Sequence, residues 1–407
     1  MDAPVFCCLR YFCTFLGKNA FQSGGFVIQW YADLSARVFR VDSSGKVVID
    51  VTASERLIEH LHMTAADAAV IFNPSNMFYL TEGYTGEGAV FISGRRRVIV
   101  TDFRYTEQAE QQSPGFEVVM TERGMSHSQW IARLCQEEGV TVLRYEDDYL
   151  TVKQFEGLRK TVGDQIAYTP VERAPEYLRQ FKTEREIACI RKACEITSKA
   201  FDMVLPLIRE GMTEKELQIE LDLIQLKLGA QCNSFDTIIA SGENGSLPHA
   251  IPGQRKLRKG DMITMDFGCK FGGYCSDMTR TVALGQPSEE MKHVYDVVLA
   301  AQEKTEQSVR PGITGGELDK IARDYINEAG FEGRFGHGLG HSLGIDIHEN
   351  PRAGMMSNDV LCAGQLITVE PGIYLPGIGG VRVENTVLVT ENGYEPLTTA
   401  PKHLIIL

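Results

Sequence analysis

The spacing of hydrophobic residues divides the chain near residue 177. From about Ala53 to that point, short apolar runs of strand length alternate with helical patterns, which predicts a small α/β domain. The helix expected at 128–138 stops before Gly139, a residue typical of helix ends. The other expected elements are a helix at 54–62 and strands at 68–72, 89–92, 98–101, 116–120 and 142–145.

Beyond residue 177, apolar residues recur at helical spacing between further strand-like segments. Three segments of the form Thr-x-x-Glu begin at Thr183, Thr213 and Thr314. In each, the Thr and Glu side chains can satisfy free amides at the start of a helix. This pattern predicts a second domain of α+β type. Its expected helices follow the first two of these segments and span 288–309 and 314–329.

We therefore divide the chain into 1–46, an α/β domain at 47–175 and an α+β domain at 176–407. The first 46 residues have no helix or strand period and lack the basic start, long apolar run and cleavage site of a signal peptide. We interpret them as an over-called start of translation, with the real chain beginning near residues 47–51. The alternative is a genuine extension that packs on the body.

Composition narrows the class of protein. The 407 residues carry a net charge of −13, which disfavours a broad nucleic-acid or anionic-membrane surface. No apolar run reaches the length of about 18 residues expected of a membrane helix. The 10 cysteines form no CxxC pair, so we expect free thiols in a reducing compartment and a cytoplasmic protein.

Two segments of the second domain resemble each other. The first carries Asp266 and Asp277, and the second carries Glu370 and Glu384. In each segment, the first acid is followed by one other residue and then by a glycine. The second acid lies about the length of one β-hairpin further along the chain. The repeat predicts that four carboxylates come from two similar hairpins.

Side-chain parity predicts where these acids point. If Gly272-Gly273 is a two-residue turn, residue 266 faces 279 and residue 268 faces 277, so Asp266 and Asp277 are diagonal neighbours on one face. A three-residue loop at 377–379 would put Glu370 opposite Thr386 and Glu384 opposite Gly372, again with both acids on one face.

Four buried carboxylates require positive charge, because each unpaired buried charge is costly. Two divalent ions would cancel the four charges, and His341 would add one imidazole to an oxygen-rich set. Such a set suits Mn²⁺, Co²⁺ or Fe²⁺ better than a structural zinc. We expect Mn²⁺, with Co²⁺, Fe²⁺ or Zn²⁺ as alternatives. Two ions can activate water and polarise a carbonyl, so the predicted chemistry is metal-assisted hydrolysis.

Several histidines accompany the acids. Residues 336–344 contain four glycines in nine positions, which excludes a stable helix. The run favours a strand or loop that a ligand or another stretch of backbone approaches closely. His341 is the expected ligand, and His337 and His348 could hydrogen-bond the substrate or the tetrahedral intermediate. His249 is a further candidate from the opposite side. For His337 and His249, a satisfied polar core residue is an equally good interpretation.

Together these residues resemble the pita-bread metallopeptidases, peptidase family M24, which includes methionine aminopeptidase, aminopeptidase P and prolidase. The resemblance covers about residues 55–405. It implies a pita-bread fold with a pseudo-twofold repeat, in which Asp266 binds one metal ion and His341 and Glu370 bind the other. Asp277 and Glu384 would bridge the ions, and Glu370 would also act as general base. The family's further histidines match His249, His337 and His348.

Two features resemble the Xaa-Pro branch of this family. One is the preceding α/β domain, similar to the creatinase/prolidase N-terminal domain, and the other is Arg382 in Gly-Val-Arg-Val-Glu. The branch implies hydrolysis of the bond before a proline at the second position of a peptide, by an enzyme that is commonly a homodimer. Dipeptidase and aminopeptidase activity both remain open. The alternatives are methionine aminopeptidase-like specificity and a metal-free creatinase-like or binding relative.

Overall fold

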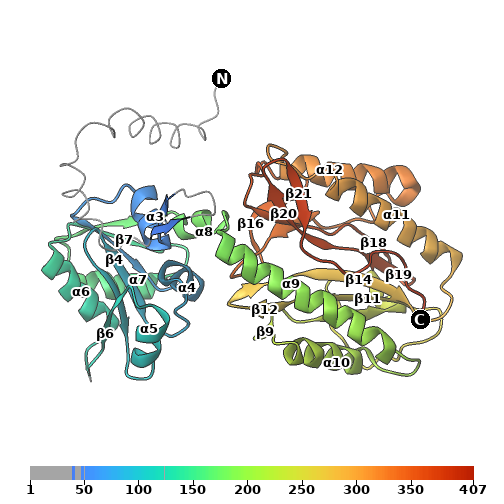
Figure 1. Ribbon diagram of the computed structural model, residues 1–407, viewed down its shortest axis with the longest axis horizontal. Helices are drawn as coiled ribbons and strands as arrows, with labels where there is room; N and C mark the ends of the chain where they lie inside the picture. The colour runs from blue at the N-terminus through green and yellow to red at the C-terminus, as the bar shows by residue number, and fades with distance from the viewer. Residues whose placement is uncertain (1–38, 42–46, 50, 123) are drawn as a thin grey trace.

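The computed structural model describes residues 39–41, 47–49, 51–122 and 124–407 (Figure 1). Most of the predicted extension at 1–46 therefore lies outside the described residues. Strands β1 (Phe39–Val41) and β2 (Val47–Ile49) pair antiparallel. None of the described helices is long and apolar enough to cross a membrane.

One mixed sheet organises the first half of the described chain. Its strand order is β6-β5-β4-β3-β7-β8, and the pairs β3–β4 and β4–β5 are antiparallel while the others are parallel. The strands are β3 (Asp67–Ile71), β4 (Ala89–Ser93), β5 (Arg97–Thr101), β6 (Glu117–Met120), β7 (Val142–Tyr145) and β8 (Ala167–Pro170).

Helices cover both faces of this sheet, as the alternating pattern predicts. Successive strand residues point to opposite faces. Ala69 and Ile71 accordingly share a core with α3 and α4, whereas Ala68 and Val70 share another with α6 and α7. Gly139 ends α6 in the left-handed conformation at φ 65°. The helices are α3 (Ala53–His60), α4 (Pro74–Thr81), α5 (Thr106–Gln112), α6 (His127–Glu138), α7 (Val152–Val162) and α8 (Ala174–Arg179).

The second half consists of two similar units. In the first, α9 (Glu184–Val204) and α10 (Glu214–Lys227) pack on the sheet β10-β11-β14. In the second, α11 (Glu289–Glu306) and α12 (Gly315–Ile326) pack on the sheet β17-β20-β21. Capping boxes open α9, α10 and α12 at the three predicted threonines. Figure 1 shows α10 and α12 at opposite edges, with the strands between them. The predicted α+β fold with an internal repeat is confirmed.

The remaining elements are the sheet strands of the two units and the shorter segments that connect them. The sheet strands of the two units are β10 (Ile238–Ser241), β11 (Met262–Phe267), β14 (Met278–Ala283), β17 (Leu366–Val369), β20 (Asn385–Thr390) and β21 (Gly393–Pro396). The connecting strands are β9 (Cys232–Asn233), β12 (Cys269–Phe271), β13 (Tyr274–Cys275), β15 (Gly340–Ser342), β16 (Glu349–Ala353), β18 (Gly372–Leu375) and β19 (Gly379–Arg382). The short helices are η1 (Leu205–Leu207), η2 (Gly242–Ser246) and η3 (Asn327–Phe331).

The register of the first hairpin was predicted correctly. Asp266 pairs with Thr279, and Phe271 pairs with Tyr274 across the Gly272-Gly273 turn. The alternation of side chains along β11 and β14 therefore points the two aspartates of this hairpin toward the same side.

The predicted register of the second hairpin is wrong by two residues. The loop is 376–378, so Gly372 pairs with Arg382 instead of Glu384, and Thr386 pairs with Thr368 instead of Glu370. Side chains alternate with a period of two, so a shift of two residues leaves both glutamates on the predicted face.

Gly340 allows β15 to lie directly against β17, as the glycine-rich run predicts. A Cβ atom at residue 340 would lie 2.0 Å from the carbonyl oxygen of Thr368. The backbone amide of Glu370 donates to the carbonyl of Leu339 at 3.0 Å, and the amide of His341 donates to Thr368 Oγ1 at 3.0 Å. This close approach places His341 beside Glu370.

Replacing Gly340 by alanine should lower the stability of the protein and displace His341. The added Cβ must push β15 away from β17, and overpacking of this kind costs about 1–3 kcal/mol. Gly336→Ala is the matched control, because a Cβ there has no neighbour within 4 Å among the described residues. Thermal unfolding of both variants tests the expectation. An equal drop in both melting temperatures, or no drop in Gly340→Ala, would contradict it.

Candidate metal centre

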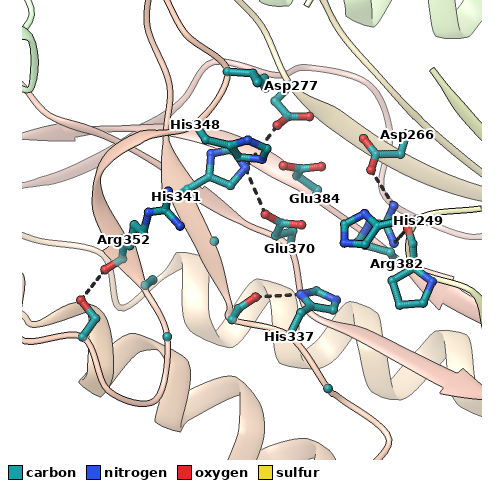
Figure 2. Close-up of a pocket in the computed structure, with 18 of the residues that line it drawn as sticks. His249, Asp266, Asp277, His337, His341, His348, Arg352, Glu370, Arg382 and Glu384 are labelled. Carbon is teal, nitrogen blue, oxygen red and sulfur yellow. Dashed lines mark hydrogen bonds and ion pairs between the residues drawn. The ribbon is translucent and has the colours of Figure 1, made fainter. Parts of the chain in front are cut away.

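The five predicted ligands converge on one cleft of about 1090 Å³ (Figure 2). Asp266 lies on β11 and Asp277 immediately precedes β14, while Glu370 immediately follows β17 and Glu384 immediately precedes β20. Each structural unit therefore delivers two carboxylates from corresponding places. His341 enters from β15, which packs beside β17.

The ligand atoms are close enough to share ions. One carboxylate oxygen each from Asp266, Asp277 and Glu384 lie within 4.8 Å of one another. His341 Nε2 lies 3.5 Å from Glu370 Oε1 and 3.6 Å from Asp277 Oδ2. The five side chains thus form one continuous set, with the imidazole at the end nearest Asp277 and Glu370.

The imidazole of His341 is prepared to bind a metal through Nε2. Its Nδ1 lies 3.0 Å from the carbonyl oxygen of Ser342, which can only accept a hydrogen bond, so Nδ1 carries the proton. Burial lowers the pKa of His341 to about 4, so the ring is neutral at physiological pH. A neutral ring protonated at Nδ1 leaves the Nε2 lone pair directed at the carboxylates.

The buried acids fit divalent cations. Asp266 Oδ1, Asp277 Oδ1 and Glu384 Oε1 are buried and have no hydrogen-bond partner among the described residues, although buried polar atoms are almost always partnered. Burial, and next the nearby charge of Glu384, raises the pKa of Asp277 well above its usual value. Burial and the charge of Glu370 do the same for Glu384. Bound cations would satisfy these oxygens and remove the repulsion.

Two threonines that the sequence analysis missed orient two of the predicted ligands. Thr279 Oγ1 donates to Glu384 Oε2 at 2.7 Å, and Thr368 Oγ1 donates to Glu370 Oε1 at 3.1 Å. Each stands two residues from a predicted ligand, Asp277 or Glu370, so strand parity could have placed it on the same face.

Arg382 and His337 belong to one chain of hydrogen bonds. Arg382 Nη2 donates to Asp266 Oδ2 at 2.5 Å, and its Nη1 donates to the Tyr374 hydroxyl at 2.8 Å. That hydroxyl lies 2.8 Å from His337 Nε2, while His337 Nδ1 lies 2.8 Å from the carbonyl oxygen of Gly338. Both ring nitrogens of His337 therefore have partners within the protein. Tyr374 was not predicted, and no local motif marks it.

His348 and His249 face the cleft from opposite sides. The rings of His348 and His341 meet edge to face, with centroids 4.4 Å apart. Figure 2 shows His249 beside Arg382, across the carboxylates from His341 and His348. Both His249 and His348 line the cleft and are exposed to it. Their positions leave both rings free to meet a bound molecule.

Asp277→Asn should change stability in opposite directions with and without metal. The substitution keeps the shape but removes a buried charge that Glu384 and Asp266 repel, so the metal-free protein should melt at a higher temperature. In wild-type protein, Mn²⁺ at a hundred times its Kd should add about 2.7 kcal/mol of stability. The variant should gain much less, because it has lost a ligand charge.

A matched control for this prediction is Asp319→Asn. Asp319 is equally buried, but its oxygens are satisfied by Arg323 and by the amide of Leu339. Its substitution should lower the melting temperature whether or not metal is added. A lower melting temperature of metal-free Asp277→Asn would contradict the assignment of residue 277 to the metal set.

Comparison with known proteins agrees with this geometry. The sequence profile of metallopeptidase family M24 matches residues 188–391, and that of the creatinase/prolidase N-terminal domain matches residues 54–181. An Xaa-Pro dipeptidase of Pyrococcus horikoshii is 36% identical over 352 residues, covering 86% of this chain and 98% of the relative.

Solved structures show the same overall likeness. An Xaa-Pro dipeptidase from Bacillus anthracis superposes with a TM-score of 0.83 at 39% identity, covering 87% of this chain and 99% of that one. An X-Pro aminopeptidase from Thermotoga maritima has a TM-score of 0.82 at 36% identity with the same coverage of both chains. The predicted pita-bread fold is confirmed, and the chain is a peptidase that belongs to metallopeptidase family M24.

Proposed function

We propose that this peptidase hydrolyses the Xaa-Pro bond of short peptides with the help of two divalent metal ions, and that dipeptides are its preferred substrates. The observation that carries the proposal is the set of carboxylate oxygens beside His341 that have no partner within the described chain and lie in an open cleft. Asp266, Asp277, His341, Glu370 and Glu384 would hold the ions. Bound there, the ions would supply Lewis-acid activation of water and of the scissile carbonyl.

Glu370 is suited to be the general base. Burial raises the pKa of this carboxyl to about 8, which makes it a stronger base than an ordinary glutamate. Thr368 fixes one of its oxygens at 3.1 Å. In the proposed reaction, Glu370 accepts a proton from the attacking water and returns it to the proline nitrogen as the carbon–nitrogen bond breaks.

The histidines and Arg382 would take different parts. His348 and His249 are free to hydrogen-bond the substrate carbonyl and the tetrahedral intermediate from opposite sides. His337 is held on both nitrogens, so its proposed part is to orient Tyr374, which accepts from Arg382. Arg382 would fix Asp266 and partly offset the negative charge of the site.

Recognition of a dipeptide can be assigned to Arg352. This residue lies on β16, lines the cleft and forms no ion pair with any described residue. An unpaired guanidinium suits a carboxylate, which it can bind with two hydrogen bonds. We infer that Arg352 receives the C-terminal carboxylate of an Xaa-Pro dipeptide. The names of two relatives, both Xaa-Pro dipeptidases, support this choice.

We expect three further properties. We expect Mn²⁺ as the activating ion because the ligand set is mostly oxygen. We also expect a homodimer in the cytoplasm. Metal analysis of protein purified without added metal and light scattering at several concentrations test the first two expectations.

Hydrolysis of Ala-Pro, Ala-Pro-Ala and Met-Ala-Ser with added Mn²⁺ tests the proposed activity. We expect cleavage of Ala-Pro, slower cleavage of Ala-Pro-Ala and none of Met-Ala-Ser. Glu370→Ala should reduce kcat by at least about a hundredfold, because it removes both a ligand and the general base. Release of methionine alone would indicate methionine aminopeptidase specificity. Absence of any metal-dependent cleavage would favour a binding relative.

Arg352→Met should raise KM for Ala-Pro by at least about tenfold, since a charge-assisted hydrogen bond pair contributes roughly 1.5–3 kcal/mol. Cleavage of Ala-Pro amide, which has no carboxylate, should change little. Arg310→Met is a control at an exposed arginine that does not line the cleft. Equal losses on both substrates would exclude a carboxylate contact at Arg352.

A further inference from the structure

A buried ion cluster lies at the junction of the two halves, outside the metal set. Arg179, the last residue of α8, and Lys182 both contact Glu349, the first residue of β16. Arg179 Nη2 lies 2.5 Å from Glu349 Oε1, and Lys182 Nζ lies 3.0 Å from Glu349 Oε2. The side chains of Arg179, Lys182 and Glu349 are 3%, 1% and 7% exposed, so water screens these charges little. Figure 1 shows α8 between the two halves.

The α/β half of the chain holds this cluster in place. Arg179 Nη1 donates to Asn76 Oδ1 at 3.0 Å, and the Asn76 amide donates to Glu146 and Glu176 at 2.8 and 2.7 Å. Ser75 Oγ donates to Asp346 Oδ1 at 2.6 Å. Ser75 of α4 and Arg179 of α8 therefore contact the segment 346–349 directly, while Glu146 and Glu176 support Arg179 through Asn76.

That segment is fixed on its other side by Glu349 itself. Glu349 Oε1 accepts from the backbone amide of Asp346 at 3.1 Å, and Arg179 Nη2 also lies 2.6 Å from Asp346 Oδ2. Gly344 packs against the same carboxylate, since a Cβ there would lie 2.6 Å from Glu349 Oε2. Burial acts to raise the pKa of Glu349, but the charges of Lys182 and Arg179 outweigh it and lower that pKa to about 2. The carboxylate is therefore ionised whenever the protein is folded near neutral pH.

The cluster ends next to the catalytic cleft. Glu349 directly follows His348, whose ring contacts the ring of His341. We propose that Arg179 and Lys182 are positioning residues that hold Glu349 and thereby orient His348 over the metal centre. The α/β half thus completes the site without lining it. The proposal deepens the proposed function, because it rests on the assignment of His348 as a substrate contact.

Arg179→Met tests the proposal by its dependence on His348. Alone, it should lower kcat/KM for Ala-Pro by about tenfold, as removal of supporting residues around a metal site commonly does, with metal content unchanged. In a His348→Ala background, it should change kcat/KM by no more than about twofold, because the residue it positions is gone. A loss of the same size in both backgrounds would overturn the proposal, since a merely structural defect acts regardless of His348.

Amide hydrogen exchange gives a second readout that needs no activity. In metal-free Arg179→Met, amides of 344–349 should exchange faster than in wild type. Tyr295→Phe is the control, because it removes a hydrogen bond from α11 to the carbonyl of Lys402 at 2.7 Å, and α11 lies on the side of the second half away from α8 (Figure 1). Unchanged exchange at 344–349, or an equal increase in Tyr295→Phe, would overturn the proposal.

A replacement variant and a readout that does not depend on activity keep the test decisive. If Arg179→Met fails to fold, Ser75→Ala replaces it, because that change removes one hydrogen bond to Asp346 and no charge. Ser75→Ala should show the same dependence on His348 and faster exchange at 344–349. If wild-type protein cleaves no Xaa-Pro substrate, the proposed function fails, while the exchange experiment still decides whether Arg179 fixes the segment 344–349.

Discussion

Mutual repulsion of buried carboxylates is the constraint on which the second half of the structure depends. Asp266, Asp277, Glu370 and Glu384 lie together in a cleft, and burial raises the pKa of Asp277, Glu370 and Glu384 above the usual values. Arg382 offsets part of that charge through Asp266. Asp266, Asp277 and Glu384 each keep one buried oxygen without a hydrogen-bond partner among the described residues, and cations bound among them would let all four acids stay ionised. The fold therefore holds these carboxylates in a mutually repulsive arrangement, and that arrangement favours the binding of cations.

The internal repeat explains how such an arrangement is held. Each unit brings its pair of acids to the ends of two neighbouring strands, β11 and β14 or β17 and β20, so the backbone of both sheets fixes their separation. Buried Arg280 ties the units together by donating to the carbonyl of Glu384, the side chain of Asn385 and the carbonyl of Ala400. Burial opposes this charge and lowers the pKa of Arg280 to about 10. The carbonyl partners keep the guanidinium in place despite that opposition.

The sequence predicted the parts of the site that obey a local period. Parity along a strand placed each pair of acids on one face, and the Gly272-Gly273 turn set the first register correctly. The loop 376–378 begins with Pro-Gly, a turn signal, but Gly379 and Gly380 follow closely and allow other placements of the turn, and the second register was predicted two residues away. The side-chain contacts of His337 were beyond reach, because its partner Tyr374 lies 37 residues away with no motif to mark it. Contacts of this kind depend on how separate elements pack.

The ion cluster at Glu349 lies furthest from any local rule, because its partners stand 167 and 170 residues away in the chain. Buried ion pairs are poor devices for stability alone, since packed apolar residues in their place are often neutral or more stable by about 1–4 kcal/mol. The charged groups instead provide directional hydrogen bonds. Arg179 meets Asn76, Asp346 and Glu349 at once, which an apolar side chain of similar volume could not do. A cluster that fixes the position of Glu349 in this way fits the positioning role that we propose for it toward the adjacent His348.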